Sequence, residues 1–114
     1  MHEYGVALEI ADLAIKTAGN RPITKVNLRI GALSGVFSES LVMYLELLLG
    51  ERQGKAPAIA VTNIGAKFRC SCGSEYAPGK IFDPCPSCGG FDRSTIDGND
   101  CTIESIEVDD DGKH

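Results

Sequence analysis

The sequence lacks the features of a secreted or membrane-spanning protein. Its first residues contain no basic segment followed by a continuous apolar stretch and a small-residue cleavage site. No apolar run approaches the roughly 20 residues that a membrane span requires. The longest run, LVMYLELLLG, is interrupted by Glu46. We therefore expect a cytoplasmic protein that has no membrane partner and whose cysteines are thiols rather than disulfides.

The chain also lacks an excess of positive charge. Its 11 Lys and Arg residues are outnumbered by 16 Asp and Glu residues, which gives a formal net charge of -5 at pH 7. Binding to nucleic acid requires a basic surface that contacts phosphates. The composition therefore disfavours a nucleic-acid partner.

Groups that support catalysis are scarce. His2 and His114 are the only histidines, and the sequence contains neither a Gly-rich phosphate loop nor a nucleophile elbow. We therefore predict that the protein is not an enzyme. A small metalloenzyme stays as the alternative with the least support.

The hydrophobic pattern predicts two helices. The first covers residues 4–18 and ends at Gly19 and Asn20. The second begins at Ser38 or Glu39 and ends at Leu49, with Gly50 as its C-terminal cap. The side chains expected to face the core are Val6, Ile10, Leu13, Ala14 and Thr17 in the first helix and Leu41, Leu45, Leu48 and Leu49 in the second.

Three stretches have the pattern of strands. TKVNLRI alternates strictly between apolar and polar residues, which indicates a strand with one buried face. IAVTNI predicts a second strand and CTIESIEV a third, in which Ile103 and Ile106 are out of phase and imply a bulge or twist. The expected fold class is α+β, with two helices packed on a small sheet of about three strands.

A segment of different composition separates the last two of these strands. KFRCSCGSEYAPGKIFDPCPSCGGFDR is rich in Gly, Pro and Ser and has too few large apolar residues for a core of its own. Cys70 and Cys72 form one close pair, Cys85 and Cys88 form a second, and the stretch between them can fold back as a short hairpin. Four converging thiolates predict a structural zinc ion, because zinc takes tetrahedral sulfur coordination.

The alternatives for these cysteines are a redox dithiol, a disulfide pair, and iron in place of zinc. The second pair lacks the strand-then-helix context of a redox motif, and a cytoplasmic location disfavours a disulfide. Gly73 and Gly89 follow the two pairs directly and relieve strain where the backbone turns. We expect a zinc-ribbon domain over residues 67–94, inserted into a domain formed by residues 1–66 and 95–114.

Two other features have simple interpretations. Cys101 lies in the last predicted strand, far from any second thiol in the sequence, and is expected to fill the core as a small hydrophobe. The acidic end DDDGKH is expected to be a solvated tail.

His2 stands directly behind the initiator methionine. The terminal amine, the amide nitrogens of His2 and Glu3 and the imidazole of His2 all lie within chelating reach of one ion. Consecutive main-chain nitrogens close five-membered rings, and Nδ1 of His2 with its own amide closes a six-membered ring. A planar set of nitrogens suits Ni(II) or Cu(II), whereas zinc has no electronic preference for a plane.

The order of these elements resembles the HypA/HybF family of hydrogenase maturation nickel metallochaperones. The resemblance rests on MHE at the start, VNLRIGALSGV between two helices, the two cysteine pairs and the closing IESIEV, and it covers essentially the whole chain. It implies a nickel-binding domain of two helices on a small sheet, with a zinc ribbon inserted before the last strand. Ni(II) is then the cargo, held by His2 with Glu3 beside it, and zinc is structural.

The zinc cysteines of the family correspond to Cys72, Cys85 and Cys88, and Cys70 departs from the pattern because CSC has one residue between its cysteines rather than two. By resemblance, the partners are the GTPase HypB and the precursor of a [NiFe]-hydrogenase large subunit. An open nickel site at the terminus suits delivery by ligand exchange. The competing hypothesis is a zinc-ribbon module that binds protein or nucleic acid and has no nickel role.

Overall fold

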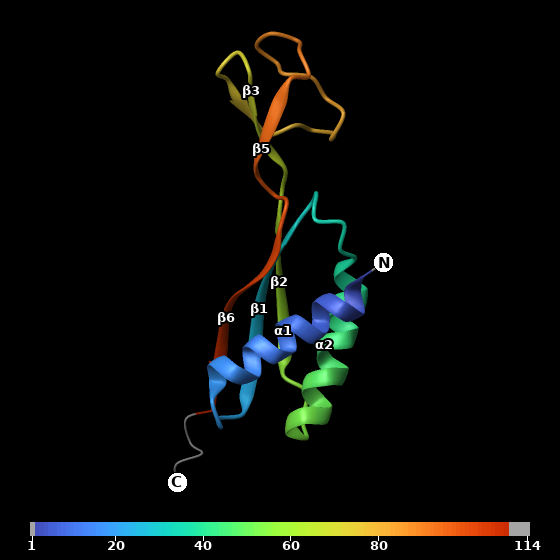
Figure 1. Ribbon diagram of the computed structural model, residues 1–114, viewed down its shortest axis with the longest axis vertical. Coiled ribbons are helices and arrows are strands. Elements are labelled where there is room, and N and C mark those ends of the chain that lie inside the picture. Colours follow the sequence, from blue (N-terminus) through green and yellow to red (C-terminus); the bar gives the residue numbers. More distant parts are fainter. Residues whose placement is uncertain (1, 110–114) are drawn as a thin grey trace.

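The computed structural model of the chain describes residues 2–109 and is elongated, with extents of 61 × 27 × 18 Å (Figure 1). Met1 and the tail residues 110–114, for which a solvated end was predicted, lie outside the described residues. In chain order the elements are α1 (Glu3–Ala18), β1 (Ile23–Gly31), α2 (Ser38–Gln53), β2 (Ala58–Ile64), β3 (Lys67–Cys70), β4 (Glu75–Tyr76), β5 (Arg93–Asp97) and β6 (Cys101–Val108).

The first sheet is three-stranded, in the order β2-β1-β6, with β2 parallel and β6 antiparallel to β1. Val26, Leu28 and Ile30 of β1 are buried, as their alternation predicted. The predicted bulge in the last strand is confirmed as well. Asn27 pairs with Ser105 but Leu28 pairs with Ile103, so one residue of β6 is left out of the ladder.

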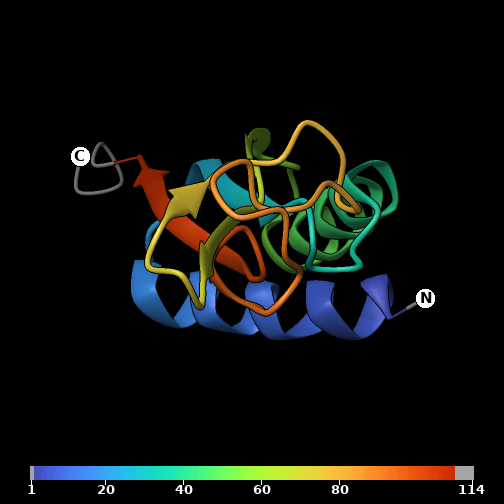
Figure 2. The same cartoon turned by 90° about the horizontal axis from the view of Figure 1, so that it is seen from above.

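The helices pack on one face of this sheet, α1 against β6 and β1, and α2 against β2. Seen from above, α1 runs along one side of the molecule, and its N-terminal end lies on the α2 side (Figure 2). No helix among the described residues is long and apolar enough to span a bilayer.

The predicted core face of α1 is partly wrong. Leu13 is 54% exposed and Thr17 is also exposed, whereas the buried apolar positions are Ile10 and a row of small residues, namely Ala7, Ala11, Ala14 and Ala18. Alanine at the contact lets a helix approach its neighbours closely, and burial follows this steric fit rather than the largest side chains.

The predicted end of α2 is also wrong. Leu41, Leu45, Leu48 and Leu49 are buried as expected, but the helix continues through Gly50 to Gln53. The cap is Gly54, which has a left-handed backbone at φ 81° and donates its N–H to the carbonyl of Gly50. Gln53 is fixed by tertiary contacts, because its side-chain amide bonds both the N–H and the C=O of Ile23 at 2.9 and 2.7 Å.

A second three-stranded sheet, in the order β4-β3-β5, lies beyond the first and carries the cysteines. β5 (Arg93–Asp97) was not predicted, and the expected hairpin between the cysteine pairs is wrong. That stretch supplies only β4, which pairs with β3 through Phe68 and Tyr76. The fold class is confirmed: two helices on a three-stranded sheet, with a separate cysteine-bearing unit between β2 and β6.

The two sheets meet at a narrow neck where glycine backbones cross. Gly31 donates its N–H to the carbonyl of Asp100, and Leu33 donates to Gly98 at 2.7 Å. A Cβ on Gly98 would lie 2.6 Å from the carbonyl oxygen of Gly65, so side chains are excluded there. Leu33 also packs against the small apolar cluster of the second sheet, which joins the loop before α2 to that sheet.

Candidate metal centres

The four cysteines of the second sheet converge on one point. Their sulfurs all lie within 4.8 Å of one another. Cys70 Sγ is 3.4 Å from Cys88 Sγ, and Cys72 Sγ is 3.7 Å from Cys85 Sγ. These separations exceed a disulfide bond of about 2.05 Å. They match the edges, about 3.8 Å, of a tetrahedron of sulfurs around an ion at about 2.3 Å.

Two tight turns bring the pairs together. In the first, Gly73 donates its N–H to the carbonyl of Cys70, three residues back; in the second, Gly89 donates to Cys85, four residues back. Both glycines have positive φ, 95° and 75°. The one-residue spacer of CSC is therefore accommodated by a turn that is one residue shorter, and Cys72 still reaches the cluster.

Four thiolates as close together as these would repel one another. Although the N–H of Gly90 stabilises its thiolate, neighbouring sulfurs raise the pKa of Cys88 to about 12. Burial opposes ionisation of Cys85, yet N–H groups of Cys88 and Ser87 help to lower its pKa to about 6. Four thiolates at this distance therefore require a cation at their centre, and a closed set of four sulfurs fits zinc.

Arg93 braces the loop between the cysteine pairs, a role that sequence reasoning missed. Its guanidinium lies 3.9 Å from the centre of the Phe68 ring and donates to the hydroxyl of Tyr76 and to the carbonyls of Ile81 and Asp83. One side chain thus ties this loop to the small apolar cluster of the second sheet. The sequence shows only an arginine in a polar stretch, because its four partners come from distant positions.

Cys101 is not part of the cluster. It lies on β6 opposite Ile30, half-buried against the main core, which agrees with the prediction of a core-filling thiol. Burial, followed by the charge of Asp100, raises the pKa of Cys101. The thiol is therefore protonated and unreactive near neutral pH.

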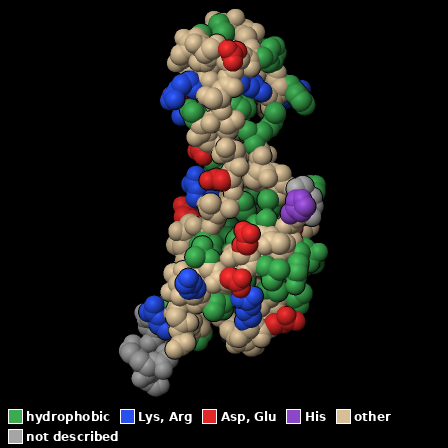
Figure 3. Space-filling view, viewed as in Figure 1, with side chains coloured by type: hydrophobic (Ala, Val, Ile, Leu, Met, Phe, Trp, Pro, Cys, Tyr) green, Lys and Arg blue, Asp and Glu red, His purple; other side chains and the backbone are tan. Residues whose placement is uncertain are grey.

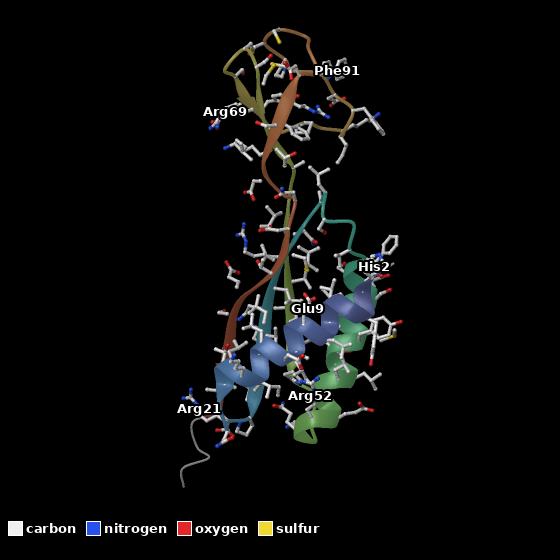
Figure 4. The ribbon with its side chains drawn as sticks, in the orientation of Figure 1. His2, Glu9, Arg21, Arg52, Arg69 and Phe91 are labelled. Carbon is white, nitrogen blue, oxygen red and sulfur yellow. The ribbon has the colours of Figure 1, made fainter. Side chains whose placement is uncertain are left out.

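His2 is the N-cap of α1 and is exposed, far from the second sheet (Figure 4). Its carbonyl accepts the N–H of Val6 at 2.9 Å, which is the first hydrogen bond of the helix. The imidazole therefore projects from a fixed backbone at the start of a helix, where N–H groups have no partner within the helix. Figure 3 shows this histidine at the edge of the molecule, beside hydrophobic side chains.

Glu3 is buried, with 6% of its surface exposed. Its Oε2 accepts the N–H of Phe37, the N-cap residue of α2, at 2.9 Å. The carboxylate thus lies at the N-termini of both helices, where a negative charge is favourable. This contact spans 34 residues, so the sequence could not reveal it. It fixes the residue next to His2 against the loop that leads into α2.

Comparisons with known proteins agree with this arrangement. A family model described as "Hydrogenase/urease nickel incorporation, metallochaperone, hypA" matches residues 1–108. The hydrogenase maturation factor HypA of Dehalococcoides mccartyi is 34% identical over 99% of this chain and 98% of its own length. That of Geotalea uraniireducens is 31% identical over 95% of this chain and 99% of its own.

Two solved structures have the same fold. The solution structure of the Ni metallochaperone HypA from Helicobacter pylori has a TM-score of 0.66 at 21% identity, covering 95% of this chain and 97% of that one. A second solution structure, of a HypA protein, has a TM-score of 0.68 at 22% identity over 95% and 96% of the two chains.

Proposed function

This chain belongs to the HypA family of non-catalytic nickel metallochaperones for hydrogenase maturation, and we propose that it holds its Ni(II) cargo at His2. The observation that supports this site is the exposed imidazole at the first turn of α1, next to a carboxylate that is buried and hydrogen-bonded. Main-chain nitrogens at the chain start complete a planar, nitrogen-rich set, which Ni(II) prefers.

Glu3 has a structural role in this proposal. Ligation of nickel by its carboxylate remains a prediction, and the bond to Phe37 supports a different contribution. By fixing the start of α1 against α2, Glu3 reduces the freedom of the neighbouring His2 and lowers the entropy lost on binding the ion. We therefore expect Glu3→Gln to weaken nickel binding less than His2→Ala does.

We propose that Cys70, Cys72, Cys85 and Cys88 hold a structural zinc ion. The support is the donor set itself, four sulfurs at tetrahedral separations. Zinc supplies the positive charge that the thiolates require and, with Arg93, the cohesion of the second sheet. The division into a nickel-binding domain (residues 1–66 and 95–114) and a zinc ribbon (residues 67–94) follows from this separation of the two metals.

The partners that we propose are the GTPase HypB and the precursor of the [NiFe]-hydrogenase large subunit, in the cytoplasm. An exposed site at the chain start lets an acceptor contribute a ligand of its own before the donor's ligands leave. The family description also names urease, whose supply by this chain would use the same site.

The test of the nickel site is a calorimetric titration of three zinc-loaded proteins: the native chain, His2→Ala, and the native chain with a few residues added before Met1. Removing a residue that only supports a metal ligand costs about 10- to 100-fold in metal affinity. We expect His2→Ala, which removes a ligand itself, to lower the nickel affinity by more than this. The extension retains the imidazole but displaces the terminal amine, and should weaken binding by a smaller factor.

Zinc content and unfolding temperature should be the same in all three proteins, because His2 is exposed and precedes the first turn of α1. Equal nickel affinity in the native and His2→Ala proteins would contradict the proposed site. A zinc-ribbon binding module without a nickel role would then be the better hypothesis.

Alkylation separates Cys101 from the other cysteines. In zinc-loaded protein at pH 7, iodoacetamide should modify no cysteine quickly, because the cluster is metal-bound and the pKa of Cys101 is raised. Chelation of zinc should unfold the second sheet and separate its four thiols. These four cysteines should then react fast and Cys101 slowly, and raising the pH should speed the reaction of Cys101. Mass spectrometry of the modified peptides measures this, and fast modification of Cys101 at pH 7 would contradict it.

A further inference from the structure

The outer edge of β2 has no strand partner among the described residues. β2 is at the end of its sheet, with β1 on its inner side. Ile64 directs its carbonyl toward β1, where it accepts the N–H of Ala32. Because alternate residues of a parallel edge strand point their N–H and C=O groups to opposite sides, those of Ile59, Val61 and Asn63 point outward. No hydrogen bond within residues 2–109 occupies them.

This edge also lacks the usual protection against pairing. Natural edge strands carry lysines, prolines or bulges that keep other strands away. The sequence of β2, AIAVTNI, has no charge and no proline, and its pairing with β1 is regular from Ala58 to Ile64. An unprotected edge that is retained in a stable fold is suited to receiving a strand.

Two hollows follow the edge between β2 and α2. The first, about 290 Å³, is lined by Val42, Met43 and Val61 together with Ser38, Glu39 and Glu46. The second, about 230 Å³, lies over the ends of β1 and β2 and is lined by Ile30, Gly31, Val36, Ser38, Asn63 and Ile64, among others. Ser38 borders both, so the two hollows are neighbours. Val61 and Asn63 are two residues apart, which is the spacing of successive side chains on one face of a strand.

The charge of the groove indicates what occupies it. Glu39 and Glu46 are exposed on its rim and have no ion-pair partner within the described chain. A lysine or arginine on the incoming strand would pair with them. In a symmetric dimer that pairs two β2 strands, the two α2 helices would lie side by side. Glu39 and Glu46 of the second copy would then lie beside these two residues, and the repulsion between like charges disfavours such a dimer.

We propose that the groove between β2 and α2 binds an extended segment of a partner protein, which adds a strand to β2. The segment places aliphatic side chains in the two hollows and a basic side chain against Glu39 or Glu46. Ser38, where the two hollows meet, adjoins Phe37, whose N–H is bonded to Glu3, so the bound segment passes near the start of α1. The proposal does not depend on nickel binding, and its test contains no nickel.

The test uses NMR titration of the zinc-loaded chain with the blocked peptide KTVTVTK, whose valines and lysines share one face. We expect chemical-shift changes along β2 and α2, and slower amide hydrogen exchange at Val61 and Asn63, whose N–H groups point outward. Exchange at Ala60 and Thr62, which pair with β1, should change little. The matched peptides are ETVTVTE, with reversed charge, and KTVPVTK, in which proline removes a central N–H. Each should bind about tenfold more weakly, or about 1.4 kcal/mol.

Matched variants locate the site. Met43 and Leu47 are equally exposed, 55% each, on successive turns of α2, but only Met43 lines the groove. Met43→Gln, which adds no charge, should weaken binding of KTVTVTK by about tenfold, and Leu47→Gln should leave it unchanged. Reversing both rim charges, Glu39→Lys with Glu46→Lys, should transfer the preference to ETVTVTE, whereas Glu51→Lys, which lines neither hollow, should not.

Three results would overturn the proposal. The first is that the amide hydrogen exchange of Val61 and Asn63 stays unaltered in a large excess of KTVTVTK. The second is equal loss of binding in Met43→Gln and Leu47→Gln. The third is protection of β2 that rises with protein concentration in the absence of peptide, accompanied by dimers in sedimentation, which would assign the edge to a second copy of the chain.

Discussion

Replacing Cys85 with serine should release the zinc and unfold the second sheet while the helices stay folded. Cys85 is 1% exposed and belongs to both the sulfur cluster and the small apolar cluster around Phe68. Metal binding to such a site supplies roughly 10 to 16 kcal/mol of apparent free energy at neutral pH. The few apolar side chains of this sheet cannot replace that contribution.

The measurement is zinc content together with an amide NMR spectrum. About one zinc per chain should fall to none in Cys85→Ser. Signals of β3, β4 and β5 should collapse to unfolded positions, and those of α1, α2 and β1 should persist. Signals of Leu33 should shift, because this residue of the loop between β1 and α2 packs against the second sheet. Cys101→Ser is the control, and it should retain zinc and both sets of signals.

Melting of the helices in Cys85→Ser would show that the chain is one cooperative unit. The core that must survive is formed by the α1 alanines, the α2 leucines and the buried face of β1, and no cysteine of the cluster belongs to it. The proposed division into two domains means that this core stays folded when the second sheet unfolds.

The elements that the sequence predicts well are those with strong local patterns. The alternation of TKVNLRI and the leucines of α2 are repeats that only one buried face satisfies, and both are confirmed. The phase break between Ile103 and Ile106 predicted a bulge correctly for the same reason. Two close cysteine pairs converge because four thiolates can share one ion, and the structure brings them together.

The features that the sequence did not predict depend on contacts between distant residues. Gly50 is a plausible helix end by local rules, yet the helix continues because Gln53 is bonded to Ile23. Glu3 looks like an ordinary first-turn carboxylate until Phe37 is found beside it. β5 has no clear alternation, and it becomes a strand by pairing with β3. In each case a contact with a residue distant in the sequence decides the local structure, and the local pattern does not identify that residue.

Gly31→Ala should be among the most destabilising single substitutions in the chain. A Cβ at this position would overlap the carbonyl group of Gly98 and lie 2.9 Å from its Cα. Both obstacles are backbone, so no side-chain rotation can relieve the overlap. The neighbouring hydrogen bonds, from Gly31 to Asp100 and from Leu33 to Gly98, would have to break for the strands to move apart.

We expect a loss of more than about 4 kcal/mol in the free energy of unfolding, a size reached only where backbone or core geometry is disrupted. Urea denaturation followed by circular dichroism measures it. Gly5→Ala is the matched control: nothing lies within 4 Å of a Cβ there, and alanine within a helix should raise stability by about 0.5 to 1 kcal/mol. If Gly31→Ala were as stable as the native chain, the close crossing at the neck could not exist as described, since a methyl group has no place in it.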